Sequence, residues 1–172
     1  MENNYTPKLL PILKWPSDEK LHEKSVDVIS FDEELEHLAQ DLFHTMKVGE
    51  GIGLAAPQTG NMINVIVIWI EPERPLAIVN PTITETSDDL YQFNEGCLSV
   101  PGYFENRKRP AKIVIECQDL KGNHHEYEFN GLYAFVIQHE IDHLNGKLFV
   151  DGASLLKKER IRAKMKKVAR RK

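Results

Sequence analysis

One segment, residues 132–143, constrains the fold of this chain more than any other. It opens with six apolar residues, from Leu132 to Ile137, and ends in Gln-His-Glu-Ile-Asp-His. A helix this apolar is too hydrophobic to face solvent, so we expect a buried helix with polar side chains at its end. Buried polar groups cost free energy unless they have partners. The rest of the chain is therefore organised around this helix.

The two histidines of this segment have the spacing of metal ligands. His139 and His143 are four residues apart, which places both imidazoles on one helix face, with Glu140 beside them as a candidate base. The alternative is an amphipathic helix with chance histidines. A metal ion accounts better for so many polar groups at the end of an apolar helix. Cys97 is the natural third ligand, because a thiolate and two imidazoles satisfy a divalent metal and leave one position open for water.

A glycine-rich stretch, Gly49 to Gln58, forms the second informative segment. Its glycines allow close backbone approach, as in a loop that binds an extended peptide or lines a tight pocket. It lacks the Lys-Ser/Thr of a phosphate-binding loop, which excludes nucleotide binding. Gln58 could donate to a developing oxyanion or make a structural hydrogen bond, and its local sequence does not decide between them.

Hydrophobic periodicity outlines the remaining elements and predicts an α+β fold. Antiparallel β-sheets are expected to pack around the central metal-binding helix, with an N-terminal and a C-terminal helix. Before residue 18 we expect an irregular arm that offers no chemistry. The terminal helix has Leu155, Ile161, Met165 and Val168 as its apolar stripe. The expected elements are a helix at 31–46 with a capping box at 30–33, strands at 64–70 and 76–81 that form an antiparallel pair, a short strand at 82–85, a hairpin of 112–117 with 125–129, a helix ending near 145–146, and a terminal helix from 154.

Length and composition predict one domain in the cytoplasm. The chain has 172 residues, of which 41% are hydrophobic, enough for one core but short for two. It contains no apolar stretch long enough for a membrane span, and its first residues do not resemble a signal peptide. Its two cysteines, Cys97 and Cys117, are not expected to form a disulfide in such a compartment.

Charge is distributed unevenly along the chain. Residues 154–172 contain ten Lys or Arg and a single Glu, a net charge of +9, whereas the other 153 residues carry −13. We therefore expect a catalytic domain at 1–153 and a basic C-terminal helix at 154–172. The basic segment could bind an anionic partner, such as ribosomal RNA, other nucleic acid or a membrane, or be a solvated helix.

Three motifs in succession resemble the signatures of peptide deformylase, bacterial type. They are Gly-Ile-Gly-Leu-Ala-Ala-Pro-Gln at 51–58, Glu-Gly-Cys-Leu-Ser at 95–99 and Gln-His-Glu-Ile-Asp-His at 138–143. The resemblance implies a metal-dependent hydrolase in the cytoplasm that removes the N-formyl group from the initiator methionine of nascent polypeptides, releasing formate. It also implies that the basic C-terminal helix meets the ribosome.

The resemblance also assigns roles to individual residues. Cys97, His139 and His143 would bind one divalent metal ion, Fe²⁺ in the cell, with Zn²⁺ or Ni²⁺ also accepted by the family. Glu140 would be the general acid/base. The Gln58 side chain and the Leu98 backbone N–H would stabilise the oxyanion together with the metal.

Helical geometry suggests where the methionine side chain binds. Val136, Phe135 and Leu132 lie three, four and seven residues before His139, on the same side of the helix. With Ile52 they are candidates for an apolar pocket, while Gly53 would pair with the peptide backbone. The alternative is that they are ordinary core residues, which is the favoured interpretation for Leu132.

Some expectations stay open at this stage. Phe104, Arg107 and Arg109 could line the mouth of the pocket or pair with carboxylates such as Asp142.

The His-Glu-x-x-His pattern also occurs in zinc proteases. Cys97 disfavours that alternative, because such proteases commonly take their third ligand from a residue after the helix. A catalytically silent binding module that uses the basic tail is the other alternative.

Overall fold

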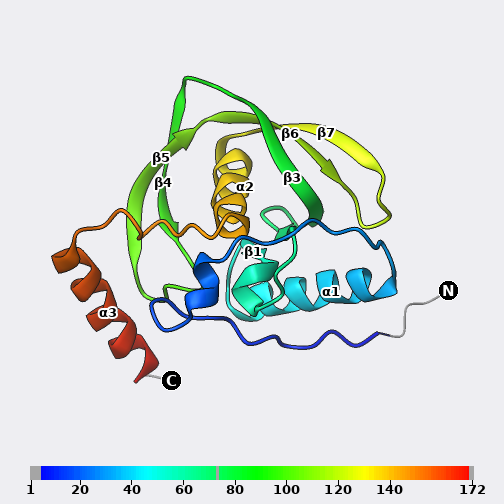
Figure 1. The fold of residues 1–172 in the computed structure, drawn as a ribbon. Helices are drawn as coiled ribbons and strands as arrows, with labels where there is room; N and C mark the ends of the chain where they lie inside the picture. The colour runs from blue at the N-terminus through cyan, green and yellow to red at the C-terminus, as the bar shows by residue number, and fades with distance from the viewer. Residues whose placement is uncertain (1–4, 73, 171–172) are drawn as a thin grey trace.

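The computed structural model describes residues 5–72 and 74–170, and a single helix, α2 (Gly131–Leu144), runs through its centre (Figure 1). Strands pass around this helix on several sides, α1 lies against the sheet, and α3 lies at the edge. The predicted α+β fold, with antiparallel sheets around a central helix, is therefore confirmed. The other elements are η1 (Glu19–His22), α1 (Glu33–Val48), β1 (Gly53–Ala55), η2 (Ala56–Thr59), β2 (Val65–Ile68), β3 (Leu76–Thr86), β4 (Leu90–Gly96), β5 (Phe104–Pro110), β6 (Lys112–Gln118), β7 (His124–Asn130) and α3 (Leu155–Ala169).

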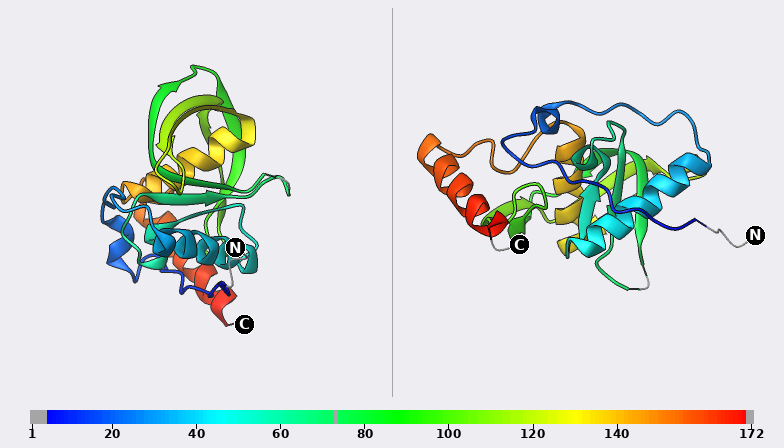
Figure 2. Two further views of the ribbon diagram at one scale, coloured as in Figure 1. Left: turned by 90° about the vertical axis from the view of Figure 1, so that its right-hand side faces the viewer. Right: turned by 90° about the horizontal axis from the view of Figure 1, so that it is seen from below.

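Five strands form an antiparallel sheet in the order β1-β2-β3-β6-β7, which curves around α2 (Figure 2). The predicted pairing of β2 with β3 and the β6–β7 hairpin are both confirmed. The sheet and α2 bury a central core between them, whose members are Ala55, Ile66, Ile68, Ile78, Ile113, Ile115, Cys117, Phe129, Ala134, Val136, Ile137, Ile141 and Leu144. The apolar half of α2 is thus covered by the sheet, as its sequence requires.

Strand β3 is longer than predicted. The expected strands at 76–81 and 82–85 are one strand, because the pairing with β6 continues across a register shift between Val79 and Thr82. Asn80 has a φ of 50° at this bulge. A bulge leaves a residue outside the ladder, which is how Pro81 is tolerated within a strand.

Strands β4 and β5 form a separate two-stranded sheet that the sequence did not reveal. Most side chains of β5 are polar and several are exposed, because this ribbon rests on α2 with one face only. A strand of this kind has little hydrophobic alternation. The sequence predicted no strand at 90–110, so both strands were missed.

Helix α1 starts two residues later than predicted. Asp32 caps it by accepting a hydrogen bond from the Leu35 N–H at 3.2 Å, while Ser30 donates to Asp32 at 2.6 Å instead of capping the helix itself. The buried face of α1 packs on the opposite side of the sheet from α2. The members of this second core are Val28, Leu35, Leu42, Met46, Leu54, Ala56, Val65, Val67 and Val79.

Helix α3 lies against the rest of the protein through a third group of buried residues, which we call the α3 core. Ile161 is fully buried there and Met165 packs beside it, but Leu155 is 81% exposed, so its place in the predicted apolar stripe was wrong. Leu155 is the first residue of the helix and precedes the docked turns. The α3 core comprises Trp15, Leu21, Val100, Tyr103, Leu148, Phe149, Val150 and Ile161.

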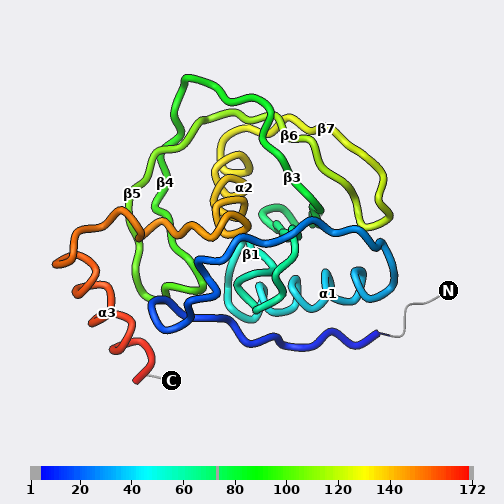
Figure 3. The backbone as a smooth tube through the Cα atoms, viewed as in Figure 1, coloured from blue at the N-terminus to red at the C-terminus, as the bar shows by residue number. Residues whose placement is uncertain are grey.

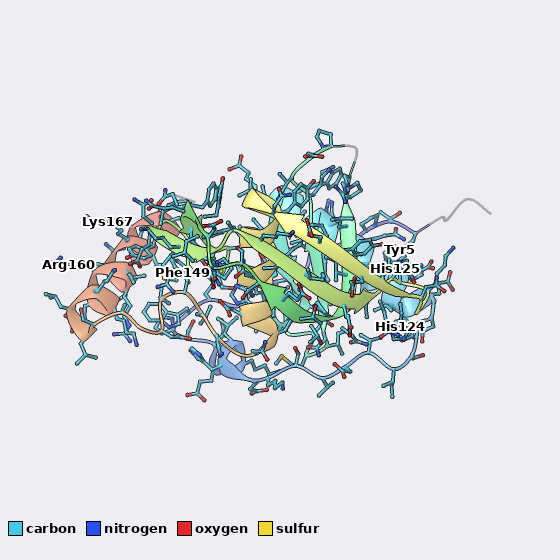
Figure 4. The ribbon with its side chains drawn as sticks, turned by 90° about the horizontal axis from the view of Figure 1, so that it is seen from above. Tyr5, His124, His125, Phe149, Arg160 and Lys167 are labelled. Atoms are coloured by element: carbon cyan, nitrogen blue, oxygen red, sulfur yellow. The ribbon has the colours of Figure 1, made fainter. Side chains whose placement is uncertain are left out.

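Phe149, labelled in Figure 4, connects α3 with the centre of the molecule. Its ring lies 5.9 Å from that of Tyr103 and 6.1 Å from that of His139. His124 and His125 lie at the opposite end from α3 (Figure 4). Within the described residues, no helix is long and apolar enough to cross a membrane. The boundary between a catalytic domain and a basic helix at residue 154 stays a prediction, and the last two residues of that helix lie outside the described part.

Both cysteines are free thiols, as expected. Cys117 lies in β6 within the central core, where burial raises the pKa of its thiol to about 11. It is therefore a protonated core side chain. Cys97 has a different position, between β4 and the loop that leads to β5.

Candidate metal centre

Three side chains from two separate segments meet beside the C-terminal half of α2. The Nε2 atoms of His139 and His143 lie 3.2 Å apart, and the Cys97 Sγ lies 3.3 Å from the His143 Nε2. One donor atom from each residue lies within 4.8 Å of the others. The predicted pairing of the helix with the cysteine loop is therefore observed, and it rests on a contact that spans more than forty residues.

The geometry of these donors fits a metal ion. In a tetrahedral site with metal–nitrogen bonds of ~2.0–2.1 Å, two ligand atoms lie about 3.3–3.4 Å apart. The 3.2 Å between the two Nε2 atoms is close to that value. A metal–sulfur bond is longer, about 2.3 Å, so the 3.3 Å between the Cys97 Sγ and the His143 Nε2 is slightly shorter than a tetrahedral site would have. Both histidines are at least nine-tenths buried, where lone pairs facing one another without a cation would be costly. The three residues form a Cys-His-His metal site.

A buried carboxylate, Glu95, orients one of these ligands. Glu95 lies on β4, is 2% exposed and contacts the His139 Nδ1. Arg109 on β5 donates to Glu95 at 2.8 Å and to Asp142 at 2.8 Å. The suggested contact of Arg109 with Asp142 is thus observed. The role of Glu95 was missed, although it lies within the cysteine motif, because only the pairing of β4 with β5 and α2 brings it to His139.

Electrostatics set the ionisation states of Glu95 and of the two histidines. Burial by itself would raise the pKa of Glu95, but hydrogen bonds from His139 and Arg109 outweigh it and lower the pKa to about 2. Glu95 therefore stays a carboxylate that accepts the His139 Nδ1–H, which leaves Nε2 as the ligand atom. Burial, with the charge of a protonated His139, holds the pKa of His143 well below its usual range, so His143 is neutral. Burial alone would lower the pKa of His139, but hydrogen bonds to Cys97 and Glu95 outweigh it and raise that pKa well above its usual range, so a metal ion would have to displace the proton at Nε2.

Glu140 lies beside the metal ligands with almost no solvent exposure. It is 3% exposed, and burial raises its pKa to about 7. A methyl group added at Gly53 would lie 2.5 Å from the Glu140 Oε1 and 2.8 Å from the Val136 Cγ1. Glycine at this position is what lets β1 approach the carboxylate so closely.

Gln58 is held by hydrogen bonds on both ends of its amide. Its Oε1 accepts from the Ala55 N–H at 2.9 Å, and its Nε2 lies 3.1 Å from the Ser99 Oγ and 3.3 Å from the Cys97 Sγ. The loop contact expected as the structural alternative is therefore present. The Nε2 also faces the metal ligands. Ser99 is fully buried and was not singled out from the sequence.

The site opens into a cavity of about 530 Å³. All four residues predicted to bind substrate line it, namely Ile52, Gly53, Phe135 and Val136. Leu132 instead packs against the central core, as favoured from the sequence. Two further lining residues are Phe104, which is 61% exposed at the mouth, and Val168 of α3. Arg107 is not among the lining residues, and its Nε lies 4.0 Å from the Glu95 Oε2.

A family model described as polypeptide deformylase matches residues 9–159, nearly the whole chain. The chain belongs to the polypeptide deformylase family. Within the family, a peptide deformylase of Cellvibrio japonicus is 45% identical over 161 residues, which is 92% of this chain and 95% of that protein. A second, from Acinetobacter baumannii, is 43% identical and covers 94% of this chain and 93% of its own length. The family predicted from the three motifs is thus confirmed.

Solved deformylase structures share the fold. The crystal structure of a peptide deformylase from Legionella pneumophila has a TM-score of 0.88 and 42% identity, covering 95% of this chain and 96% of that one. One from Ehrlichia chaffeensis in complex with actinonin has a TM-score of 0.86 and 35% identity, covering 96% and 98%. The match spans both sheets and the Cys-His-His site, so a zinc protease and a silent binding module are no longer needed as explanations.

We expect Glu95→Gln to weaken metal binding without unfolding the protein. An amide of the same shape removes the charge that holds the His139 Nδ1–H, and loss of such a partner typically lowers metal affinity roughly 10–100-fold. Affinity is measured by competition with a chromophoric chelator at fixed pH.

Glu105→Gln is the matched control. Glu105 is also on the β4–β5 ribbon, but it pairs with Lys157 rather than with a ligand. Unchanged affinity in Glu95→Gln, or equal losses in both variants, would show that the carboxylate does not orient His139.

Proposed function

We propose that this chain hydrolyses the N-formyl group of the initiator methionine of new polypeptides, releasing formate and a free amino terminus. The observation that carries the proposal is the buried Glu140 carboxylate beside a Cys-His-His metal site, in the lining of a cavity of about 530 Å³. Glu140 would act as general acid/base. Gln58 and the Leu98 N–H would stabilise the oxyanion.

The metal site is proposed to hold Fe²⁺ in the cell, with Zn²⁺ or Ni²⁺ as substitutes. Cys97, His139 and His143 offer one sulfur and two nitrogen donors, a set that several divalent ions of this series accept. A divalent ion held there would act as a Lewis acid toward the formyl oxygen and would make water more acidic. Metal analysis after anaerobic purification tests the identity, and zinc as the main metal would contradict iron.

Glu140 has the properties of a group that receives and returns a proton near neutral pH. Its raised pKa of about 7 places both protonation states within reach. The Oε2 atom is buried and has no hydrogen-bond partner among the described residues, so it offers an uncommitted acceptor. Glu140 would take the proton of the attacking water and deliver it to the leaving amine, which becomes the free amino terminus.

Two donors are proposed for the oxygen of the formyl group as it gains charge. The Gln58 Nε2 is held in place by the Ala55 N–H at the other end of its amide. The Leu98 N–H follows the metal ligand Cys97 directly in sequence. Donors that are fixed before the reaction stabilise the oxyanion without reorganising, which is the main source of their effect.

We expect Glu140→Gln to keep its metal and lose nearly all turnover. An amide cannot accept the proton, and loss of a general acid/base costs about 10²–10⁴-fold in kcat. Release of formate from formyl-Met-Ala-Ser measures the rate, and metal content is measured on the same preparation.

Glu128→Gln is the matched control, since Glu128 is an exposed β7 residue paired with Lys112. A Glu140→Gln enzyme with most of its activity would remove Glu140 from the role.

Treating the wild type with a chelator should abolish formate release, and adding a divalent ion should restore it.

We propose that Phe135 and Val136 form the pocket for the methionine side chain, with Ile52 at its rim. Phe135 and Val136 are 1% and 6% exposed, yet both line the cavity, whereas Ile52 is 37% exposed. Phe93 packs edge-on against Phe135 at 5.5 Å and fixes its ring. An apolar wall of fixed shape beside the reacting group suits a long, unbranched side chain.

Val136→Trp should narrow this pocket and selectively reduce hydrolysis of formyl-methionine peptides. We expect kcat/KM for formyl-Met-Ala-Ser to fall about tenfold or more, because the larger side chain fills the space for methionine. Formyl-Ala-Ala-Ser is the matched substrate and should lose less, which separates narrowing from misfolding. An unchanged ratio between the two substrates would show that this helix face is not the pocket.

The basic helix is proposed to bring the enzyme to the ribosome in the cytoplasm, where new amino termini emerge. Four cations, Arg160, Lys166, Lys167 and Arg170, are exposed and make no ion pair within the described residues. Arg160 and Lys167 lie on α3 at the edge of the molecule (Figure 4). An exposed cationic face of this kind suits the phosphates of ribosomal RNA.

Replacing these four cations with Gln should weaken ribosome binding and flatten its salt dependence. Each lost phosphate contact reduces the slope of log K against log salt by about one. The measurement is co-sedimentation with ribosomes over a salt series, with formyl-Met-Ala-Ser activity expected to stay at the wild-type level. Deleting α3 would be less informative, because it would also uncover the α3 core.

The matched control replaces Lys20, Lys24, Lys108 and Lys121, which are exposed and lie outside α3, with Gln. This variant has the same net charge. Equal ribosome binding by the α3 variant and the wild type would contradict the proposal, and so would equal losses in both variants.

A further inference from the structure

The N-terminal arm, from Tyr5 to Asp18, runs along α1 and then continues to the catalytic loops (Figure 3). The Tyr5 hydroxyl donates to Asp41 of α1 at 2.9 Å, and the Leu10 N–H donates to the Thr45 Oγ1 at 2.9 Å. The arm was expected to be irregular and to offer no chemistry. It is irregular, but its last part contacts both segments that carry the proposed oxyanion donors.

Three consecutive arm residues connect these two segments. The Leu13 N–H donates to the Gln58 carbonyl at 2.8 Å, and the Trp15 N–H donates to the Ser99 carbonyl at 3.0 Å. Between them, the Lys14 Nζ donates to the Leu98 carbonyl at 2.6 Å. The arm therefore joins η2 to the cysteine loop at the two residues whose donors must point at the same oxygen.

Hydrogen bonds fix the peptide groups on both sides of Leu98. The Cys97 carbonyl, whose peptide plane contains the Leu98 N–H, accepts from the Val100 N–H at 2.9 Å. The next peptide plane contains the Leu98 carbonyl and is held by Lys14. Since each peptide group is planar, holding both planes fixes the two dihedral angles of Leu98 and with them the direction of its N–H. The bond from Lys14 is charge-assisted and thus stronger than a neutral one.

We propose that Lys14 is a positioning residue that aims the Leu98 N–H at the oxyanion. The proposal rests on the role of the Leu98 N–H given above. The ammonium group of Lys14 also places a positive charge on the carbonyl of Leu98, the residue whose N–H would face the developing oxyanion. Lys14 does not itself contact the reacting atoms.

The same contacts separate this role from a purely structural one. The arm is held to η2 and to the cysteine loop by the backbone hydrogen bonds of Leu13 and Trp15, and Trp15 is buried in the α3 core. The side chain of Lys14 is only half-buried. Removing its charge should therefore leave the arm in place and loosen the orientation of Leu98.

The test compares Lys14→Met, which keeps an unbranched stem without the charge, with Lys14→Arg in the metal-loaded enzyme. Deleting an oxyanion donor costs about 10²–10³ in kcat, and loosening one should cost less, so we expect a loss of about tenfold in Lys14→Met. KM for formyl-Met-Ala-Ser, metal content and the thermal midpoint should stay close to the wild type. Lys14→Arg should recover most of kcat, because it restores a charged donor.

Hydrogen exchange at the Leu98 amide provides a readout that does not depend on turnover. Exchange followed by nuclear magnetic resonance should be faster in Lys14→Met than in the wild type, while the Cys117 amide in β6 should be unaffected. Lys20→Met is the matched control, since Lys20 is an exposed lysine on η1.

Two results would overturn the proposal. One is an unchanged kcat in Lys14→Met, and the other is a joint change of kcat, KM and thermal midpoint that Lys14→Arg does not repair. If the wild type itself released no formate, the proposed function would fail first. The Leu98 exchange rate would then decide on Lys14 alone, and equal rates in the wild type and Lys14→Met would refute it.

Discussion

The structure depends on burying three ionisable side chains at the end of an apolar helix. His139, Glu140 and His143 are all at least nine-tenths buried in α2, which also forms one wall of the central core. Moving such groups out of water is costly unless they gain partners. The two histidines gain the Cys97 sulfur and a metal site, and His139 gains Glu95 as well. Glu140 has no ion pair among the described residues, and burial raises its pKa.

Each of the two sheets contributes residues that contact these buried side chains. The five-stranded sheet covers the apolar face of α2 and contributes Gly53, whose missing side chain admits the Glu140 carboxylate. The β4–β5 ribbon covers the polar end and contributes Glu95 and Arg109. The Arg109 side chain is only 12% exposed and lies between the carboxylates of Glu95 and Asp142, which balance its charge.

The loop between β4 and β5 is held from the outside by both ends of the chain. The N-terminal arm bonds to Leu98 and Ser99, and α3 packs on Val100 and Tyr103 through the α3 core. Val168 of α3 also reaches the cavity. A loop that carries a metal ligand and a candidate oxyanion donor has little regular structure of its own, so its rigidity must come from neighbours.

The sequence by itself determined the central helix, its metal ligands, the family and most of the five-stranded sheet. Local patterns predict those features: helical spacing for His139 and His143, β-branched runs for β2 and β3, and a motif around Cys97. Only the tertiary structure decided the β4–β5 ribbon, the partners of Glu95 and the contact of Lys14 with Leu98. Glu95 and His139, like Lys14 and Leu98, are far apart in the chain, and the β4–β5 ribbon lies in a segment of ordinary polar composition. Their pairing follows from where α2 is buried, which no local pattern specifies.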